Sequence, residues 1–572
     1  MQTSRAAHTR LLRLAPLLLL AAACQGNLSA DDSTSPAGAG QGGANVGSGG
    51  APAMSVPRPP AGTFAGPIVS SPAPSSRFLR LNHAQWENSV RDALKLSASL
   101  GLSGAFVGEP LRTLFDTNGS VLSVSADTFR DYQIAAESLA KTIAHDTTIV
   151  GRFAPTKDAT ALIQNLGKRA FRRPLTDAEV SSVKALFDKG KALVGSGDDF
   201  ADGVELVATY LFQSPYFLYR TELSSTVVAG KIPLNGYEIA SKLAYALTAS
   251  MPDDTLLAAA DASALSTREQ VLAEAKRLLA TKAAAAVVAD FHDQLLMMRD
   301  FDQISKDARF AGFGAGIGAD LKGEAKAFIQ SVAFEQDRGF QTLMSAPYTF
   351  ANTRIRGLYG LPSVAGEDPT KFSRVELNPA QRSGLLTQIG FLAANGEQDM
   401  PNIIIRGVHI ARQILCSPLP APPDNVPPLP GPMPNMTNRM RVSELTKNAP
   451  CSACHTTIIN PLGYAFESLD GVGQFRTMDN GLPIDTTATF AMDGANVSFN
   501  GPVELVKAIA QSEQAHACYA QHWAEYLYGR PVAAATDQSL IQQGGWLSRD
   551  KESLQNLIIN LLATDAFLTR SP

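Results

Sequence analysis

Helix-start signals recur along the chain from Arg77 onward, and they constrain its fold more than any other feature. In each, a Ser, Thr or Asn side chain can cap the first turn, and a Glu or Gln three residues later can reach back to the cap. Segments with helical apolar spacing follow, such as Leu243 and Leu247. We therefore predict a mainly α fold. The predicted capping pairs are Asn82 with Gln85, Thr176 with Glu179, Asn235 with Glu238, Ser266 with Glu269, and Asn378 with Gln381.

Breaks in this pattern divide the chain into modules, as expected because its 572 residues exceed what one hydrophobic core usually supports. Toward the C-terminal end of the chain, Asp479-Asn480-Gly481 and Asp493-Gly494 are tight-turn signals beside short β-prone segments. They predict a small β element within the multi-domain helical protein. The expected modules span 77–150, 155–225, 230–370, 375–478 and 480–570.

The N-terminus has the pattern of a bacterial export signal. Three arginines precede the apolar run Leu14–Ala23, and Cys24 follows, so that Leu20–Cys24 resembles a lipobox whose cysteine is lipidated. We expect residues 1–23 to be a signal peptide and 24–76, rich in Gly, Ser, Ala and Pro, to be a flexible linker. The chain is then an exported lipoprotein held to a membrane by its lipid, in the periplasm or at the outer-membrane surface. The alternative is a soluble exported protein in which Cys24 is incidental.

The segment Cys451-Ser452-Ala453-Cys454-His455 carries the clearest chemistry in the sequence. In a Cys-x-x-Cys-His motif, two thiols can add to the porphyrin vinyl groups while the adjacent imidazole binds the iron. We therefore predict a covalent haem c site on Cys451 and Cys454, with His455 as the proximal iron ligand, in a cytochrome c-like module at 375–478. A backbone carbonyl of Pro461-Leu462-Gly463 is a candidate acceptor for the His455 Nδ1–H.

Two other interpretations use the same cysteines. Cys451 and Cys454 can form a disulfide or redox pair in an oxidising compartment. Alternatively, both can bind zinc together with Cys518 and His522, which lie four residues apart and so on one face of a helix. For Cys518 we favour a disulfide with Cys416, the only other cysteine without an assigned role.

The sequence does not identify the sixth iron ligand. Met478 and Met492 follow the motif, as methionine ligands usually do, and would raise the reduction potential. His516 or His522 would give a bis-histidine iron with a lower potential. Without a sixth ligand, the iron would be open to small molecules or peroxide.

Two further segments have structural interpretations. The basic run Lys168–Pro174 reads as a solvated face or a set of internal salt-bridge donors. Asp116–Ser120 lacks the spaced ligands of a calcium loop and reads as a turn. We find no G-x-S-x-G, H-E-x-x-H or Walker pattern, and the net charge of -4 gives no reason to expect a nucleic-acid partner.

Several segments together resemble a family of multi-domain exported cytochrome-like proteins of unknown function, typical of planctomycetes and myxobacteria. They include Arg77–Asn82, Arg169–Leu175, Phe212–Arg220 and Cys451–Arg476. Within the last segment, Pro461-Leu462-Gly463, Glu467, Asp470, Gly473 and Arg476 match the family, whereas Asn460 replaces a frequent Asp. Glu467, Asp470 and Arg476 either serve haem propionates and protons or fix the loop after the haem helix.

The expected function is extracytoplasmic electron transfer by a membrane-anchored c-type cytochrome-like protein with one haem c and an unknown redox partner protein. One alternative is a surface structural or binding lipoprotein whose haem or disulfide only stabilises it. Another is a haem-dependent peroxidase or oxidase.

Overall fold

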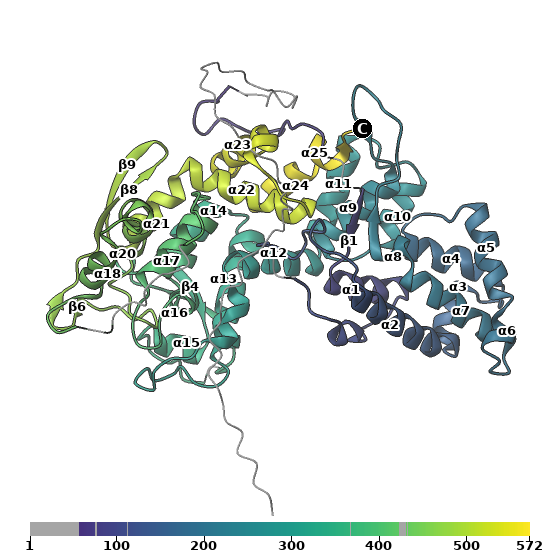
Figure 1. Cartoon of the computed structure of the whole chain (residues 1–572), viewed down its shortest axis with the longest axis horizontal. Coiled ribbons are helices and arrows are strands. Elements are labelled where there is room, and N and C mark those ends of the chain that lie inside the picture. Colours follow the sequence, from purple (N-terminus) through teal and green to yellow (C-terminus); the bar gives the residue numbers. More distant parts are fainter. Residues whose placement is uncertain (1–56, 75–76, 111–112, 367, 423–430, 432) are drawn as a thin grey trace, which may run out of the picture. The chain divides into compact units, whose positions relative to one another are not determined.

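The structure is a computed structural model that describes residues 57–74, 77–110, 113–366, 368–422, 431 and 433–572. The expected signal peptide, Cys24 and residues 24–56 of the expected linker lie outside the described residues, as do residues 423–430 and 432. Helices dominate the described chain, which confirms the mainly α prediction (Figure 1). Among the described residues, no helix has the length and apolar character needed to cross a bilayer.

One hydrophobic cluster forms around Trp86, Tyr132, Leu211 and Phe212, all at most 1% exposed, from apolar residues between positions 86 and 218 together with Met251 and Leu257. The helices of the first two expected modules share this core, so neither module buries its apolar face alone. These helices are α1 (His83–Ala93), α2 (Ala126–Ala144), α3 (Thr147–Phe153), α4 (Ala159–Phe171), α5 (Asp177–Phe187), α6 (Gly190–Leu193), α7 (Asp199–Gln213) and α8 (Pro215–Leu218), with the 3₁₀ turn η1 (Leu102–Ala105).

Most of the following helices contribute to a second, larger hydrophobic cluster, whereas Ile403, Val442 and Tyr464 form a third, small one. The first of them cover 236–358: α9 (Gly236–Thr248), α10 (Asp254–Asp261), α11 (Arg268–Leu279), α12 (Lys282–Leu295), η2 (Met298–Gln303), α13 (Ile317–Gln330), the π turn η3 (Ser331–Glu335), α14 (Phe340–Ser345) and α15 (Thr353–Leu358). Next come η4 (Leu385–Thr387), α16 (Ile389–Ala394), α17 (Ile403–His409), the π turn η5 (Ile410–Ile414), α18 (Asn438–Thr446), α19 (Ser452–Cys454), the π turn η6 (His455–Ile459) and α20 (Asn460–Tyr464).

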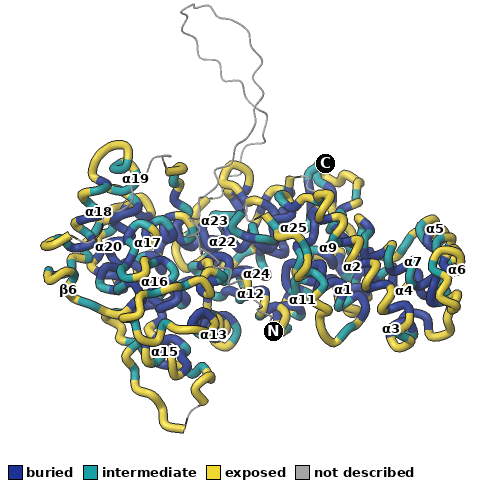
Figure 2. The backbone as a smooth tube through the Cα atoms, turned by 60° about the horizontal axis from the view of Figure 1, so that its bottom comes forward, coloured by how far each residue is buried: buried dark blue, intermediate teal, exposed yellow. Residues whose placement is uncertain are grey.

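The C-terminal helices complete the larger cluster, and most residues of α22 are buried (Figure 2). Gly545 lets α23 approach α22 closely, because a Cβ at this position would meet the Ala517 Cα at 2.8 Å. These helices are α21 (Pro502–Gln511), α22 (Glu513–Tyr528), α23 (Ala534–Lys551), α24 (Leu554–Leu562) and α25 (Asp565–Leu568).

The strands of the described chain form two-stranded antiparallel pairs. The turns predicted at Asn480-Gly481 and Asp493-Gly494 each join two strands, and all four residues have positive φ, as type I′ turns require. The small β element is therefore confirmed. The pairs are β1 (Phe78–Arg80) with β2 (Tyr219–Thr221), β3 (Ile232–Pro233) with β10 (Thr569–Arg570), β4 (Tyr348–Ala351) with β5 (Ser373–Glu376), β6 (Met478–Asp479) with β7 (Leu482–Pro483), and β8 (Thr487–Met492) with β9 (Ala495–Asn500).

Three of the five predicted capping boxes form as expected, at Asn82, Thr176 and Asn235. The fourth is displaced by one residue, to Thr267 with Gln270, because Gln270 reaches back to this cap. The fifth prediction was wrong, since the chain after Asn378 makes only a turn.

The turn after Asn378 ends where Arg382 and Gly384 meet the protein interior. The buried Arg382 guanidinium donates to the Thr387 carbonyl at 2.8 Å. Gly384 has positive φ, and a Cβ there would lie 2.3 Å from the Leu343 carbonyl oxygen. Tertiary contacts therefore stop a helix that the local sequence favours.

Part of the expected flexible linker is packed against the C-terminal helices. Ile68 is 1% exposed within the larger cluster. The Gln543 side chain of α23 accepts from the Val69 N–H at 3.0 Å and donates to its carbonyl at 2.9 Å. The described residues 57–74 thus differ from the linker expectation, because a few apolar side chains among them find a surface to cover.

Candidate functional site

The Cys451–His455 motif lies on a short, half-exposed helical segment made by α19 and the start of η6 (Figure 2). Cys451 and Cys454 are both free and partly exposed, so the structure does not join them in a disulfide. The His455 ring is partly exposed beside them. Two thiols and an imidazole within one helical turn are the groups required for covalent haem attachment and iron binding.

The His455 Nδ1 atom lies 2.9 Å from the Oδ1 atom of Asn460. A π turn brings these two side chains together, since η6 runs from His455 to Ile459 and its hydrogen bonds join residues five apart. The predicted acceptor, a backbone carbonyl of Pro461-Leu462-Gly463, was therefore wrong. The acceptor is the side chain immediately before that segment.

Neighbouring hydroxyl groups fix the orientation of the Asn460 amide. Its Nδ2 atom donates to Thr446 Oγ1 at 2.8 Å and to Tyr464 OH at 3.2 Å. Thr446 Oγ1 donates its own hydrogen to the Val442 carbonyl, so it can only accept from Asn460. The amide oxygen therefore faces His455, whose Nδ1 must carry the hydrogen. This tautomer leaves the lone pair of His455 Nε2 for a metal ion.

The Pro461-Leu462-Gly463 segment serves helix packing. A Cβ at Gly463 would lie 2.1 Å from the Ile403 carbonyl oxygen, and one at Gly407 would lie 2.0 Å from the Ile459 carbonyl oxygen. The backbones of α17 and α20 thus cross almost in contact, with Leu462 fully buried behind them. This close crossing supports the helix that carries Asn460.

The polar residues after the motif hold the chain that follows it. The fully buried Arg406 guanidinium donates hydrogen bonds to the backbone carbonyls of Phe466 and Leu469, at 3.1 and 2.8 Å. Asp470 Oδ1 accepts from the N–H groups of Val472 and Gln474, which closes a turn.

Glu467 and Arg476 flank this turn in the chain and are hydrogen-bonded to each other. Arg476 Nε donates to the Glu467 carbonyl at 3.0 Å, and its Nη1 donates to Asp479 at 2.7 Å. Burial raises the pKa of the Glu467 carboxyl to about 7, although Arg476 and a hydrogen bond from Asn438 oppose the shift. These contacts favour the interpretation that Glu467, Asp470 and Arg476 fix the loop.

The two candidate methionine ligands differ in environment. Met492, on β8, is 2% exposed and packs in the larger core with Phe490 and Phe499. Met478, on β6, is 51% exposed. Met492 is thus committed to core packing, whereas Met478 remains accessible.

The candidate histidine ligand His516 is occupied within the C-terminal helices. Its Nδ1 lies 2.9 Å from Ser548 Oγ and its Nε2 lies 3.1 Å from the Ala510 carbonyl. Burial lowers the pKa of His516 to about 4. Its ring is fully buried with both nitrogens bonded, which disfavours a bis-histidine iron through His516.

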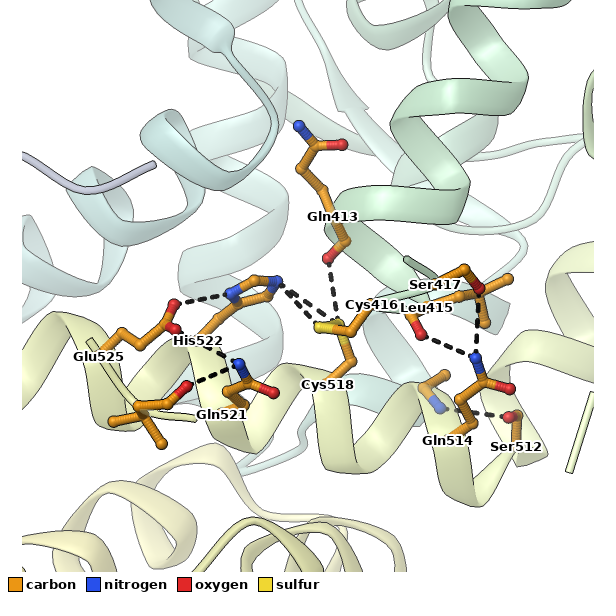
Figure 3. The surroundings of a disulfide bond; sticks show 12 residues. Gln413, Leu415, Cys416, Ser417, Ser512, Gln514, Cys518, Gln521, His522 and Glu525 are labelled. Atoms are coloured by element: carbon orange, nitrogen blue, oxygen red, sulfur yellow. Dashed lines mark hydrogen bonds and ion pairs between the residues drawn. A yellow bond between two sulfur atoms is a disulfide. The ribbon is translucent and has the colours of Figure 1, made fainter. Parts of the chain in front are cut away.

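His522 lies against a disulfide that joins Cys416, after η5, to Cys518 on α22 (Figure 3). Its Nε2 lies 3.4 Å from Cys518 Sγ and 3.6 Å from Cys416 Sγ, and its Nδ1 lies 3.2 Å from Glu525 Oε2. Because Cys518 is bonded to Cys416, it offers no thiolate to a zinc ion shared with Cys451 and Cys454. The structure therefore does not assemble the zinc set considered from the sequence.

The basic run before Pro174 is used inside the protein. Arg172 donates to the carbonyls of Tyr216 and Phe217 at 2.7 and 3.1 Å, while Arg173 pairs with Glu179 at 2.8 Å. Arg169 donates to the Ala93 carbonyl at 3.0 Å. These arginines hold α4 against its neighbours, as the structural interpretation expected.

Sequence reasoning missed Asn460 and Arg406 as parts of the site. Asn460 was noted only as a departure from the family pattern, and its position five residues after His455 gives no signal unless a π turn is foreseen. Arg406 follows three isoleucines in Ile403-Ile404-Ile405-Arg406. A single charged residue in such an apolar run is the only sequence signal that it is buried and hydrogen-bonded to several acceptors.

Five models of protein domains match successive parts of the chain. Each is described as a protein of unknown function: DUF1587 at 79–145, DUF1595 at 158–222, DUF1592 at 234–361, DUF1588 at 382–479 and DUF1585 at 496–567. The DUF1588 range includes Cys451, Cys454 and His455. Neither a curated protein nor a solved structure matches the chain. The chain is therefore a multi-domain protein built from five successive domains of unknown function, a set typical of the cytochrome-like proteins that its sequence resembles.

Proposed function

We propose that this protein is a membrane-anchored c-type cytochrome that transfers electrons outside the cytoplasm through one haem c. The observation that carries the proposal is the Asn460 contact. A network of hydroxyl groups fixes the amide so that His455 Nδ1 is the donor, which leaves Nε2 as the metal-binding atom. A histidine held in one tautomer beside two free cysteines suits the chemistry of haem c.

In this proposal, Cys451 and Cys454 hold the haem through thioether bonds, and His455 is its proximal ligand. Each thiol adds its sulfur and hydrogen across one vinyl group, so attachment changes no oxidation state. When bound, the haem supplies a one-electron iron couple. Asn460 keeps the imidazole in place. A neutral amide is a weaker hydrogen-bond acceptor than a carboxylate, so it would make the imidazole a less electron-rich ligand and favour a higher reduction potential than an aspartate would.

Export and anchoring belong to the same proposal. The signal peptide and a lipid on Cys24 would place the protein in the periplasm or at the outer-membrane surface, where haem c is attached. The partner would be another redox protein, and the formal charge of -4 gives no support for nucleic acid.

Visible absorption of the full chain, matured with a haem c attachment system, tests the proposal. We expect a six-coordinate, low-spin spectrum that interconverts reversibly between oxidised and reduced forms. His455→Ala should abolish that spectrum, whereas His516→Gln, which changes a histidine already bonded on both sides, should preserve it. High-spin iron that binds cyanide and turns over peroxide would contradict electron transfer and favour a peroxidase or oxidase.

A further inference from the structure

The His522 imidazole lies against both sulfurs of the Cys416–Cys518 disulfide (Figure 3). Its Nε2 atom is 3.4 Å from Cys518 Sγ and 3.6 Å from Cys416 Sγ. His522 is only 7% exposed, and the Phe115 ring packs edge-to-face against its imidazole. The ring is therefore held with Nε2 directed at the two sulfurs.

Glu525 determines which nitrogen of His522 carries the hydrogen. Its Oε2 atom lies 3.2 Å from His522 Nδ1, and its Oε1 atom accepts from Gln521 Nε2 at 3.4 Å. An ionised carboxylate only accepts hydrogen bonds, so Nδ1 is the donor and the lone pair of the neutral ring is on Nε2. Metal-binding histidines usually have this arrangement, in which the second nitrogen is bonded to a carboxylate.

The disulfide offers Nε2 no hydrogen-bond donor, because neither of its sulfurs carries a hydrogen. A buried nitrogen lone pair thus faces two sulfur atoms that have only lone pairs to present. Buried polar atoms normally have a partner of the opposite kind. The contact therefore indicates that an electron-pair acceptor lies among these three atoms in another state of the site.

The distances identify that acceptor as a tetrahedral metal ion. With Zn–S bonds of about 2.3 Å and a Zn–N bond of about 2.0 Å, the nitrogen lies about 3.5 Å from each sulfur, and the two sulfurs lie about 3.8 Å apart. The observed distances from Nε2 to the two sulfurs are 3.4 and 3.6 Å. The histidine is thus already placed as a ligand, and only the bonded sulfurs must separate.

Reduction by a dithiol separates the two sulfurs. Cys416 is partly exposed, whereas Cys518 is 2% exposed, so the first thiolate of the dithiol attacks Cys416 Sγ. The electron pair of the broken bond passes to Cys518 Sγ, which takes up a proton. The second thiolate of the dithiol then displaces Cys416, which also takes up a proton, and the dithiol becomes a disulfide. Two cysteine thiols remain beside the His522 lone pair.

We propose that Cys416, Cys518 and His522 bind one Zn²⁺ ion when a dithiol has reduced the disulfide. Each thiol releases its proton, so two thiolates neutralise the charge of the ion, His522 Nε2 is the third ligand and water is the fourth. The ion then links the chain after η5 to α22 in place of the disulfide. Cys451 and Cys454 take no part, so the site is independent of the proposed haem.

Anaerobic titration with Co²⁺ tests the proposal, because the absorption of this ion reports thiolate ligands and tetrahedral geometry. The full chain carries Cys451→Ala with Cys454→Ala and no haem, so the Cys-x-x-Cys-His motif cannot bind the probe. Treatment of the folded chain with dithiothreitol should release two additional thiols. After removal of the reductant, the chain should bind one Co²⁺ with thiolate charge-transfer and tetrahedral d–d bands, and Zn²⁺ should remove both bands. The unreduced chain should show neither band.

Two histidine variants on α22, made in this chain, separate metal ligation from a general effect on the helix. His522→Gln should weaken Co²⁺ binding at least tenfold. His516→Gln is the matched control, since both nitrogens of His516 are bonded to other groups, and it should change binding less than twofold. Circular dichroism of the reduced variants checks that both are folded.

Protection from alkylation needs no further variant. Zn²⁺ should slow the alkylation of Cys416 and Cys518 in the reduced chain at least tenfold, because thiolates bound to the ion are poor nucleophiles. Failure to release two thiols from the folded chain, absence of the cobalt bands after reduction, equal binding by His522→Gln and His516→Gln, or alkylation unaffected by Zn²⁺ would each overturn the proposal.

Discussion

Removing the Cys416–Cys518 disulfide should destabilise the larger core, and the size of the effect follows from the loop that the bond closes. The two cysteines are 102 residues apart. Closing a loop of about 100 residues lowers the entropy of the unfolded chain by an amount worth about 4.7 kcal/mol at 25 °C in the chain-entropy model. Measured losses for native disulfides are about 2–5 kcal/mol. We expect Cys416→Ala with Cys518→Ala to lower the free energy of unfolding by an amount in that range.

Urea unfolding followed by circular dichroism measures this loss. The wild-type protein in a reducing agent should unfold at nearly the same urea concentration as the double variant, because both lack the cross-link. The matched control is Cys451→Ala with Cys454→Ala in the haem-free chain, which changes two partly exposed, free cysteines and should shift the free energy of unfolding by no more than about 0.5 kcal/mol. Wild-type unfolding that is insensitive to the reducing agent, or alkylation of Cys416 and Cys518 in the unreduced, denatured chain, would refute the reasoning.

Three further changes probe the segment after the haem motif. Gly463→Ala should lower the thermal midpoint, with a loss of about 1–3 kcal/mol, because the new methyl group meets the Ile403 carbonyl; an unchanged midpoint would contradict the close helix crossing. The contribution of Glu467 to the free energy of unfolding should fall as pH rises from about 4.5 to about 7, because its pKa is raised on folding and the folded protein holds its proton longer. The buried His516, whose pKa is lowered, contributes in the opposite direction, so the measurement is the difference between the pH profiles of the wild type and Glu467→Gln. Identical profiles would exclude this contribution of Glu467. In the haem-loaded protein, Asn460→Asp should lower the reduction potential measured by spectroelectrochemistry, since a carboxylate on His455 stabilises oxidised iron, and an unchanged or higher potential would contradict the assigned contact.

Short-range patterns were enough to predict the helical class, the small β element and three of the five proposed capping boxes. Asn82, Thr176 and Asn235 cap as expected because each capping box involves only four consecutive residues. The error at Asn378 has a long-range cause, since Gly384 and its neighbours must fit against residues near Leu343. Local propensity cannot foresee such a contact.

In the candidate site too, residues that act together within a short stretch of chain could be predicted, whereas those brought together by tertiary structure could not. Cys451, Cys454 and His455 are visible as a motif because their chemistry needs adjacent positions in the chain. The Asn460 contact depends on a π turn, which the local sequence does not indicate. The hydrogen bonds from Arg406 to the carbonyls of Phe466 and Leu469 join positions 60 and 63 residues apart, which no local pattern can predict.

Intact-mass analysis of the full chain, matured with a haem c attachment system and then extracted with acid acetone, tests the central claim most directly. We predict that the wild-type chain keeps the added mass of one haem and that Cys451→Ala with Cys454→Ala keeps none. Cys416→Ala with Cys518→Ala should still keep one haem if the chain folds. Loss of all haem from the wild-type chain during extraction would contradict covalent attachment at this motif.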